Sequence, residues 1–155
     1  MSFPELVISD TSCLVNLERI DSLLLLKKLF EKIVITEEVA MEFGRKLPDW
    51  IEVRKTPQLF LQSLQNKKLH LGELSVLALG LELKRNCLLL IDDEVARNEC
   101  QRLGFRFIGL LGVLLRAKDA GIIEQIRPLI ERLQEAGFRM SQNLIQEVLC
   151  QAGEL

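Results

Sequence analysis

Short apolar runs alternate along the chain with longer segments whose apolar residues recur at helical spacing. The runs are rich in aliphatic residues and predict buried strands, and the longer segments predict helices. The predicted strands are residues 6–9, 32–35, 51–54, 87–91 and 105–108. The predicted helices are residues 12–19, 23–30, 37–45, 59–65, 73–85, 94–103, 110–120, 128–136 and 142–152. Strands separated by helices favour βαβ units and a parallel sheet covered by helices on both faces.

Composition is ordinary for a globular protein, with 48% hydrophobic and 27% charged residues, and 155 residues suffice for one domain with a full core. The net charge of −2 provides no strong field for long nucleic acid. There is no signal peptide and no apolar run long enough to span a bilayer, so we expect a cytoplasmic protein that does not enter a membrane.

The residues that are missing limit the chemistry. The four cysteines show no C-x-x-C spacing, and His70 is the one histidine, which argues against zinc and thioredoxin-like sites. No Walker A, G-x-S-x-G or G-x-G-x-x-G motif occurs. If the chain is an enzyme, carboxylates with a metal ion are the remaining means of catalysis.

Acidic residues follow two of the predicted strands. Asp10 comes after the first strand, and Asp92 and Asp93 come after the fourth. The carboxyl ends of parallel strands meet at one crevice, and carboxylates gathered there repel each other unless a cation lies among them. The pattern therefore predicts a divalent-metal site and a hydrolytic activity.

Two further acids lie on helical faces that also carry apolar residues. Glu42 shares a face with Val39 and Phe43, where an unpaired charge is unfavourable. Glu73 opens a predicted helix, and Val76 and its neighbours follow at helical spacing. Metal binding would explain both positions, but a first-turn acid such as Glu73 is also stabilised by the helix dipole.

Helix capping is the alternative for the acids at the strand ends. Asp10 precedes Thr11 and Ser12, and all three residue types cap helices. Asp92 or Asp93 is expected to cap the next helix, which leaves the other to face the crevice, because adjacent residues point in different directions. Taken together, the acids predict a site for Mg²⁺ or Mn²⁺, which prefer oxygen ligands.

Motifs spread over nearly the whole chain resemble those of PIN-domain proteins. They are most similar to a bacterial and archaeal branch described as predicted nucleic-acid-binding. The motifs are residues 8–12 (ISDTS), 39–42 (VAME), 71–73 (LGE) running into Ala78, 89–97 (LLIDDEVAR), 109–115 (GLLGVLL) and 136–141 (AGFRMS).

The resemblance implies a single PIN-like domain over residues 1–155, built as a three-layer α/β/α sandwich around a five-stranded parallel sheet. It implies that Asp10, Glu42, Glu73 and Asp93 are the catalytic, metal-binding acids, with Asp92 as a further candidate ligand. Many family members have aspartate where Glu73 stands, and the longer side chain could alter the metal geometry.

Supporting roles also follow from the resemblance. Thr11 or Ser12 would hydrogen-bond a ligand carboxylate or a metal-bound water. Arg97 and Arg116 are candidates for contact with substrate phosphate, although exposed helix arginines are more often only solvated.

Active members of the family are Mg²⁺- or Mn²⁺-dependent endoribonucleases, and many are toxins of toxin–antitoxin pairs. The resemblance thus implies metal-assisted hydrolysis of RNA, a homodimer, and an antitoxin as partner protein. The first alternative is a non-catalytic PIN-like module that binds RNA or protein. Phosphoryl-transfer folds are less favoured, since Asp10-Thr11-Ser12 supplies a single acid where haloacid-dehalogenase phosphatases have two.

Overall fold

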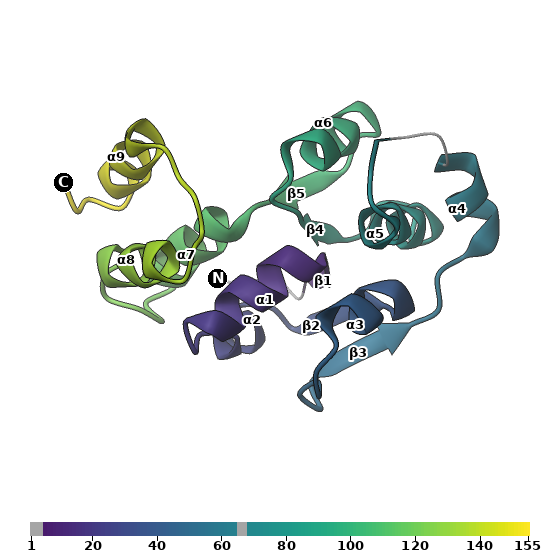
Figure 1. Cartoon of the computed structure of the whole chain (residues 1–155), viewed down its shortest axis with the longest axis horizontal. Coiled ribbons are helices and arrows are strands. Elements are labelled where there is room, and N and C mark those ends of the chain that lie inside the picture. The colour runs from purple at the N-terminus through teal and green to yellow at the C-terminus, as the bar shows by residue number, and fades with distance from the viewer. Residues whose placement is uncertain (1–4, 65–67) are drawn as a thin grey trace.

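A computed structural model of the protein describes residues 5–64 and 68–155 (Figure 1). The elements are β1 (Leu6–Ser9), α1 (Thr11–Arg19), α2 (Leu24–Leu29), β2 (Lys32–Thr36), α3 (Glu37–Phe43), β3 (Ile51–Arg54), α4 (Gln58–Leu64), α5 (Leu71–Glu82), β4 (Leu88–Leu90), α6 (Glu94–Arg102), β5 (Arg106–Ile108), α7 (Leu110–Asp119), α8 (Arg127–Glu135) and α9 (Gln142–Gln151). Every predicted strand and helix is present, with ends that differ by a few residues. The predicted end of the fourth helix, Gln65, lies outside the described residues.

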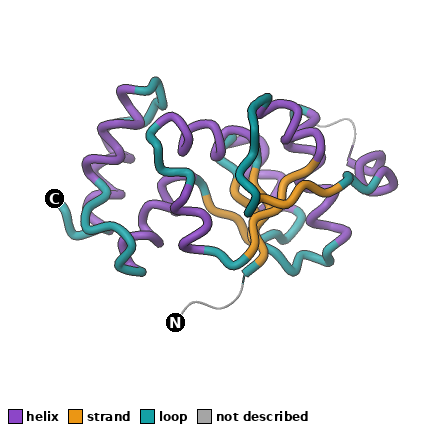
Figure 2. Tube along the Cα trace, turned by 90° about the horizontal axis from the view of Figure 1, so that it is seen from below, coloured by secondary structure: helices purple, strands orange, loops and turns teal. Residues whose placement is uncertain are grey.

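The five strands form one parallel sheet in the order β3-β2-β1-β4-β5. The first and fourth strands are therefore neighbours, with Ile8 opposite Leu89. Beyond the end of β1, the Asp10 N–H donates to the Leu90 carbonyl at 3.0 Å. Helices lie on both sides of the strands, which confirms the predicted α/β/α fold (Figure 2). Asp10 and the residues after β4 are thus held at one edge of the sheet.

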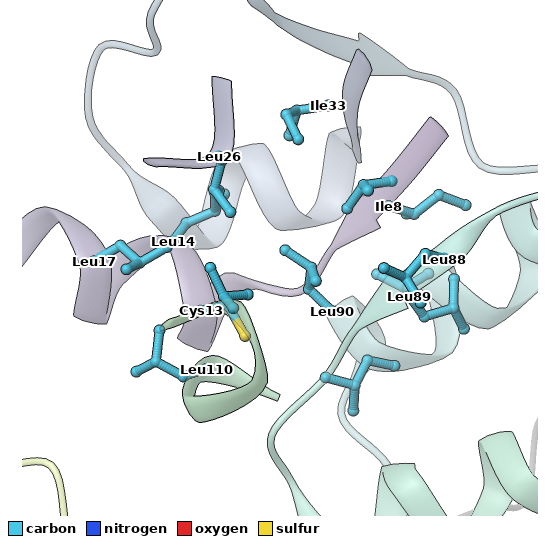
Figure 3. Packing of buried hydrophobic residues seen from close by; sticks show 14 of the residues in the cluster. Ile8, Cys13, Leu14, Leu17, Leu26, Ile33, Leu88, Leu89, Leu90 and Leu110 are labelled. Atoms are coloured by element: carbon cyan, nitrogen blue, oxygen red, sulfur yellow. The ribbon is translucent and has the colours of Figure 1, made fainter. Parts of the chain in front are cut away.

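The core explains the apolar runs in the sequence. Central strands of a parallel sheet are covered on both faces, so successive residues are all buried. Ile8 and Leu89 are both inaccessible to solvent, as is Leu14 of α1, which packs in the same cluster (Figure 3). Cys13 lies in this cluster too (Figure 3), three residues after Asp10 in the sequence.

The last three helices, α7, α8 and α9, gather at one end of the molecule (Figure 1). Their apolar residues mostly complete the core, and Ile130, Leu133 and Val148 are buried. Leu144 is an exception at 39% exposed. No helix in the described part of the chain is both long and apolar enough to cross a membrane.

Candidate functional site

Asp10 directly follows β1 and caps α1, and the residue is almost entirely buried, at 3% exposed. Asp10 Oδ1 accepts a hydrogen bond from the Cys13 N–H at 2.8 Å, and Oδ2 accepts from the Asp92 N–H at 3.3 Å. Burial first, and then the charge of Asp92, raise the pKa of Asp10 to about 7, although these hydrogen bonds lower it. A buried acid is thus poised to change its charge near neutral pH.

Asp92 lies beside Asp10 and faces the N-terminus of α7. Asp92 Oδ1 accepts from the Leu110 N–H at 2.8 Å, and Oδ2 accepts from the Cys13 thiol at 3.4 Å. Gly109 allows this approach, because a Cβ there would lie 2.5 Å from Asp92 Oδ1. Burial raises the pKa of Asp92, while the Leu110 N–H, the Cys13 thiol and the charge of Arg97 oppose the shift.

Asp93, the next residue, has a different hydrogen-bond partner. It caps α6, its Oδ2 accepts from the Ala96 N–H at 3.0 Å, and the residue is exposed. One aspartate of the pair, Asp93, caps the helix, as expected from the sequence, but both aspartates line the same cavity. The structure shows that Asp92, not Asp93, is the direct neighbour of Asp10.

Glu42 is exposed, which corrects the expectation that it lies on the packed side of its helix. Val39 and Phe43 face the core, and the helical rotation places Glu42 at the edge of that apolar stripe. Its Oε1 accepts from the Thr11 hydroxyl at 3.1 Å. The carboxylate also lies against the first turn of α5, where a Cβ at Gly72 would be 1.8 Å from Oε1.

Glu73 stands at the third position of α5, because this helix begins at Leu71 rather than at Glu73. His70 precedes the helix with extended backbone, and its N–H donates to Glu73 Oε1 at 3.1 Å in a capping box. Partial burial is the main cause that raises the pKa of Glu73, and the charges of Asp93 and Glu42 add to it.

Two adjoining cavities collect these side chains. The acidic cavity, about 140 Å³, is lined by Asp10, Thr11, Ser12, Glu42, His70 and Glu73. The mixed cavity, about 660 Å³, continues from it past Asp92 and Asp93 toward β5, α7 and α9, and both cavities include Ser12 and Glu73. All seven predicted site residues therefore line this pair of cavities. Ser12 faces Asn16, whose amide donates to its hydroxyl at 3.3 Å.

Helix N-termini explain how so many acids can lie together. Asp10, Glu73, Asp93 and Asp92 stand at the N-termini of α1, α5, α6 and α7 respectively, and each accepts at least one backbone N–H there. Backbone donors and the positive ends of the helix dipoles stabilise carboxylates. In the described part of the chain, no three His, Cys, Asp or Glu side chains converge closely enough to hold an ion as they stand.

The two candidate arginines have different surroundings. Arg97 lines the mixed cavity, and its guanidinium lies over the Phe107 ring, 5.4 Å from the centroid. Arg116 lies elsewhere, where it pairs with Glu5 at 3.1 Å, which argues against the suggested contact with substrate.

Several residues of the site could not be recognised in the sequence. In the sequence, Cys13 looks like any buried apolar residue. Its position three residues after the capping Asp10 does match the backbone N–H that a helix cap binds. Gly72 carries a weak signal, a glycine directly before an acid at a helix start. Arg139 carries no signal in the sequence, since its place in the wall of the mixed cavity depends on the path of the segment before α9.

A comparison with protein families places the chain. A family model described as a PIN domain matches residues 6–154, and the protein therefore belongs to the PIN-domain family. PIN domains are typically nucleases that use divalent metals, so the family indicates a nuclease-type function with nucleic acid as substrate. No curated protein matches the chain.

Proposed function

We propose that the protein is an endoribonuclease that hydrolyses phosphodiester bonds of RNA with Mg²⁺ or Mn²⁺. The observation that carries the proposal is the convergence of acids from two strand ends and two helices on adjoining cavities at one edge of the sheet. Active sites of open parallel sheets lie at this edge, beyond the carboxyl ends of the strands.

The donors suit a hard divalent cation. The five acids of the site offer carboxylate oxygens, which Mg²⁺ and Mn²⁺ prefer as ligands. These acids are Asp10, Glu42, Glu73, Asp92 and Asp93. Burial and the charges of neighbouring acids raise the pKa of Asp10 and of Glu73, so a positive charge beside these carboxylates would be stabilised. When bound, the cation would lower the pKa of a water and stabilise the leaving oxyanion.

The protein side chains divide into an inner and an outer group. Asp10 and Asp92 are held from within by Cys13 and by the start of α7, so their carboxylates keep fixed directions. Glu73 lies nearer the opening, and its raised pKa suits it to accept a proton from an attacking water at a carboxylate oxygen. Thr11 orients Glu42 by donating its hydroxyl hydrogen.

The biological setting follows the family resemblance. We infer that the protein is the toxin of a toxin–antitoxin pair, that it acts as a homodimer, and that an antitoxin protein controls it. All four cysteines are free, which supports a reducing compartment such as the cytoplasm.

The decisive experiment combines cleavage of a single-stranded RNA with thermal melts, each with Mn²⁺ and with EDTA. Wild type should cleave only with Mn²⁺ and should melt at a higher temperature with the ion, since binding to the folded state stabilises it. Asp10→Asn should abolish both responses. Absence of cleavage together with a melting temperature that ignores Mn²⁺ would count against the nuclease.

A matched pair of variants tests the division between the two neighbouring aspartates. Asp92→Asn should lose cleavage and the Mn²⁺ response, because Asp92 lies beside Asp10. Asp93→Asn should retain more cleavage and a larger Mn²⁺ response than Asp92→Asn, because asparagine still caps α6. Asp49→Asn, an exposed aspartate outside the lining of both cavities, is the control. The reverse ranking would favour the quartet with Asp93 that the resemblance implies.

A non-catalytic PIN-like module that binds RNA or protein is the second candidate. The observation in its favour is that, among the described residues, the acids around the cavities include no three close enough together to hold an ion as they stand. Such a module would bind RNA equally with Mn²⁺ and with EDTA and would leave it intact.

A further inference from the structure

The mixed cavity extends well beyond the acids. Its 660 Å³ falls within the range of small-molecule sites, roughly 300–1,000 Å³. One end carries Glu73, Asp92 and Asp93, and the rest is built from β5, α7, α9 and the segment before α9. Any polymer whose backbone reaches the acids therefore has room for a side group in this cavity.

The two basic residues in the cavity wall form no salt bridge in the part of the chain that the structure describes, although the charge of Arg97 acts on the nearby Asp92. Within the described ranges, neither Arg97 nor Arg139 forms a salt bridge, whereas Arg54, Arg106 and Arg116 each pair with a glutamate. Stacking on Phe107 holds the Arg97 guanidinium beside Asp92, at the boundary between the acids and the cavity. A guanidinium that forms no salt bridge is free to bind a phosphate of a substrate that reaches the acids.

The remaining wall is mostly apolar, with Glu147 and Gln151 of α9 as polar members, and it contains two aromatic rings. Phe107 and Phe138 lie in it together with Met140 and Leu144, and all four are at least partly accessible. Proteins bind unstacked RNA bases on aromatic rings, on arginine planes and against apolar side chains. The arginines thus match the phosphate of a nucleotide, and the apolar, aromatic wall matches its flat base.

We propose that the mixed cavity binds one unstacked nucleobase of single-stranded RNA, while Arg97 and Arg139 bind the phosphates on either side of that nucleotide. This inference rests on the proposed function and names the form of RNA that the site accepts. Bases within a duplex are stacked and paired, so they cannot enter. The protein should therefore act on loops and unpaired segments.

The test measures binding of a short fluorescein-labelled single-stranded RNA by anisotropy in EDTA, where neither metal nor cleavage contributes. Arg97→Ala removes the phosphate contact, and Leu144→Trp fills the cavity from its exposed rim. Each should weaken binding roughly tenfold, about the effect of losing one stacking or phosphate contact. The same RNA annealed to its complement should bind more weakly to wild type.

Arg19→Ala is the matched control, because Arg19 is an exposed helix arginine outside both cavities. It should bind the RNA like wild type, and thermal melts should show all variants folded. Unchanged binding by both Arg97→Ala and Leu144→Trp, or equal binding of duplex and single strand, would overturn the inference.

Failure of this inference can be told apart from failure of the nuclease proposal. Cleavage by wild type with normal binding by the cavity variants would reject the base site and keep the nuclease. Weakened binding by the variants without any Mn²⁺-dependent cleavage would keep the base site in a non-catalytic RNA-binding protein. Binding of a peptide to the cavity in place of RNA would reject the base site.

Discussion

The thiol of Cys13 donates to Asp92 Oδ2 at 3.4 Å, across 79 positions of sequence. The backbone N–H of the same cysteine donates to Asp10 Oδ1 at 2.8 Å. One fully buried residue thus contacts both inner acids, each through a different atom. Because Asp10 and Asp92 come from neighbouring strands, Cys13 fixes the position of one carboxylate relative to the other.

Replacement of Cys13 should distinguish the effect of its hydrogen bond to Asp92 from the effect of its packing in the core. Cys13→Ala deletes the donor to Asp92, so the pKa of Asp92 should rise and Mn²⁺ should stabilise the protein less at neutral pH. Cys13→Ser keeps a hydroxyl donor and should recover part of the response. Thermal melts over a series of Mn²⁺ concentrations measure the effect.

Cys100→Ala is the control for Cys13. Cys100 is equally buried but forms no hydrogen bond with either acid among the described residues. Both alanine variants should lower the free energy of unfolding by about 1–2 kcal/mol through lost packing. An equal loss of the Mn²⁺ response in the two variants would show that the Cys13 contact has no special role.

Stability should depend on pH through Asp10. Its pKa rises from 3.8 in a free side chain to about 7 in the folded protein. Between these values the folded state holds a proton that the unfolded state has lost, so the free energy of unfolding should fall as pH rises from about 4 to about 7. The shift corresponds to at most about 4 kcal/mol, and Asp92 and Glu73 act in the same direction.

Denaturant unfolding at several pH values measures this slope, and Asp10→Asn isolates the contribution of Asp10. Asparagine cannot ionise, so the free energy of unfolding of the variant should fall much less between pH about 4 and about 7. At pH about 8 the variant should be at least as stable as wild type. It gives up one acceptor for the Asp92 N–H, which limits the gain. Equal slopes in the two proteins would mean that Asp10 is already ionised at low pH.

Gly72 should matter for the site through the space that it leaves. In Gly72→Ala the new methyl group would occupy the place of the Glu42 carboxylate, which must turn away and leave Thr11. The variant should therefore cleave RNA more slowly, by roughly the tenfold that about 1.4 kcal/mol represents. Cleavage rates with saturating Mn²⁺ measure the change.

A double-mutant cycle shows whether the effect of Gly72→Ala runs through Glu42. In a Glu42→Ala background the alanine at 72 meets no carboxylate, and the better helix former should stabilise α5 by up to about 1 kcal/mol. If Gly72→Ala slows cleavage equally in both backgrounds, the methyl group acts on something other than Glu42.

Several features of this protein are determined by the sequence itself. Buried parallel strands need continuous apolar runs and covering helices need apolar stripes, so local periodicity already predicts β1 to β5 and the helices between them. The position of Asp10 after the first strand likewise predicts an acid at the carboxyl edge of the sheet. These features depend on neighbours in the chain, which a sequence displays directly.

The tertiary structure alone decides how the acids are arranged. Asp92 and Asp93 are chemically identical in the sequence, and contacts with distant segments separate them, since Asp92 binds the Cys13 thiol and the Leu110 N–H of α7. The backbone of Arg97 is as helical as that of Arg116, yet one guanidinium reaches the mixed cavity and the other reaches Glu5. Contacts between distant segments depend on packing in three dimensions, and no local pattern of residues encodes them.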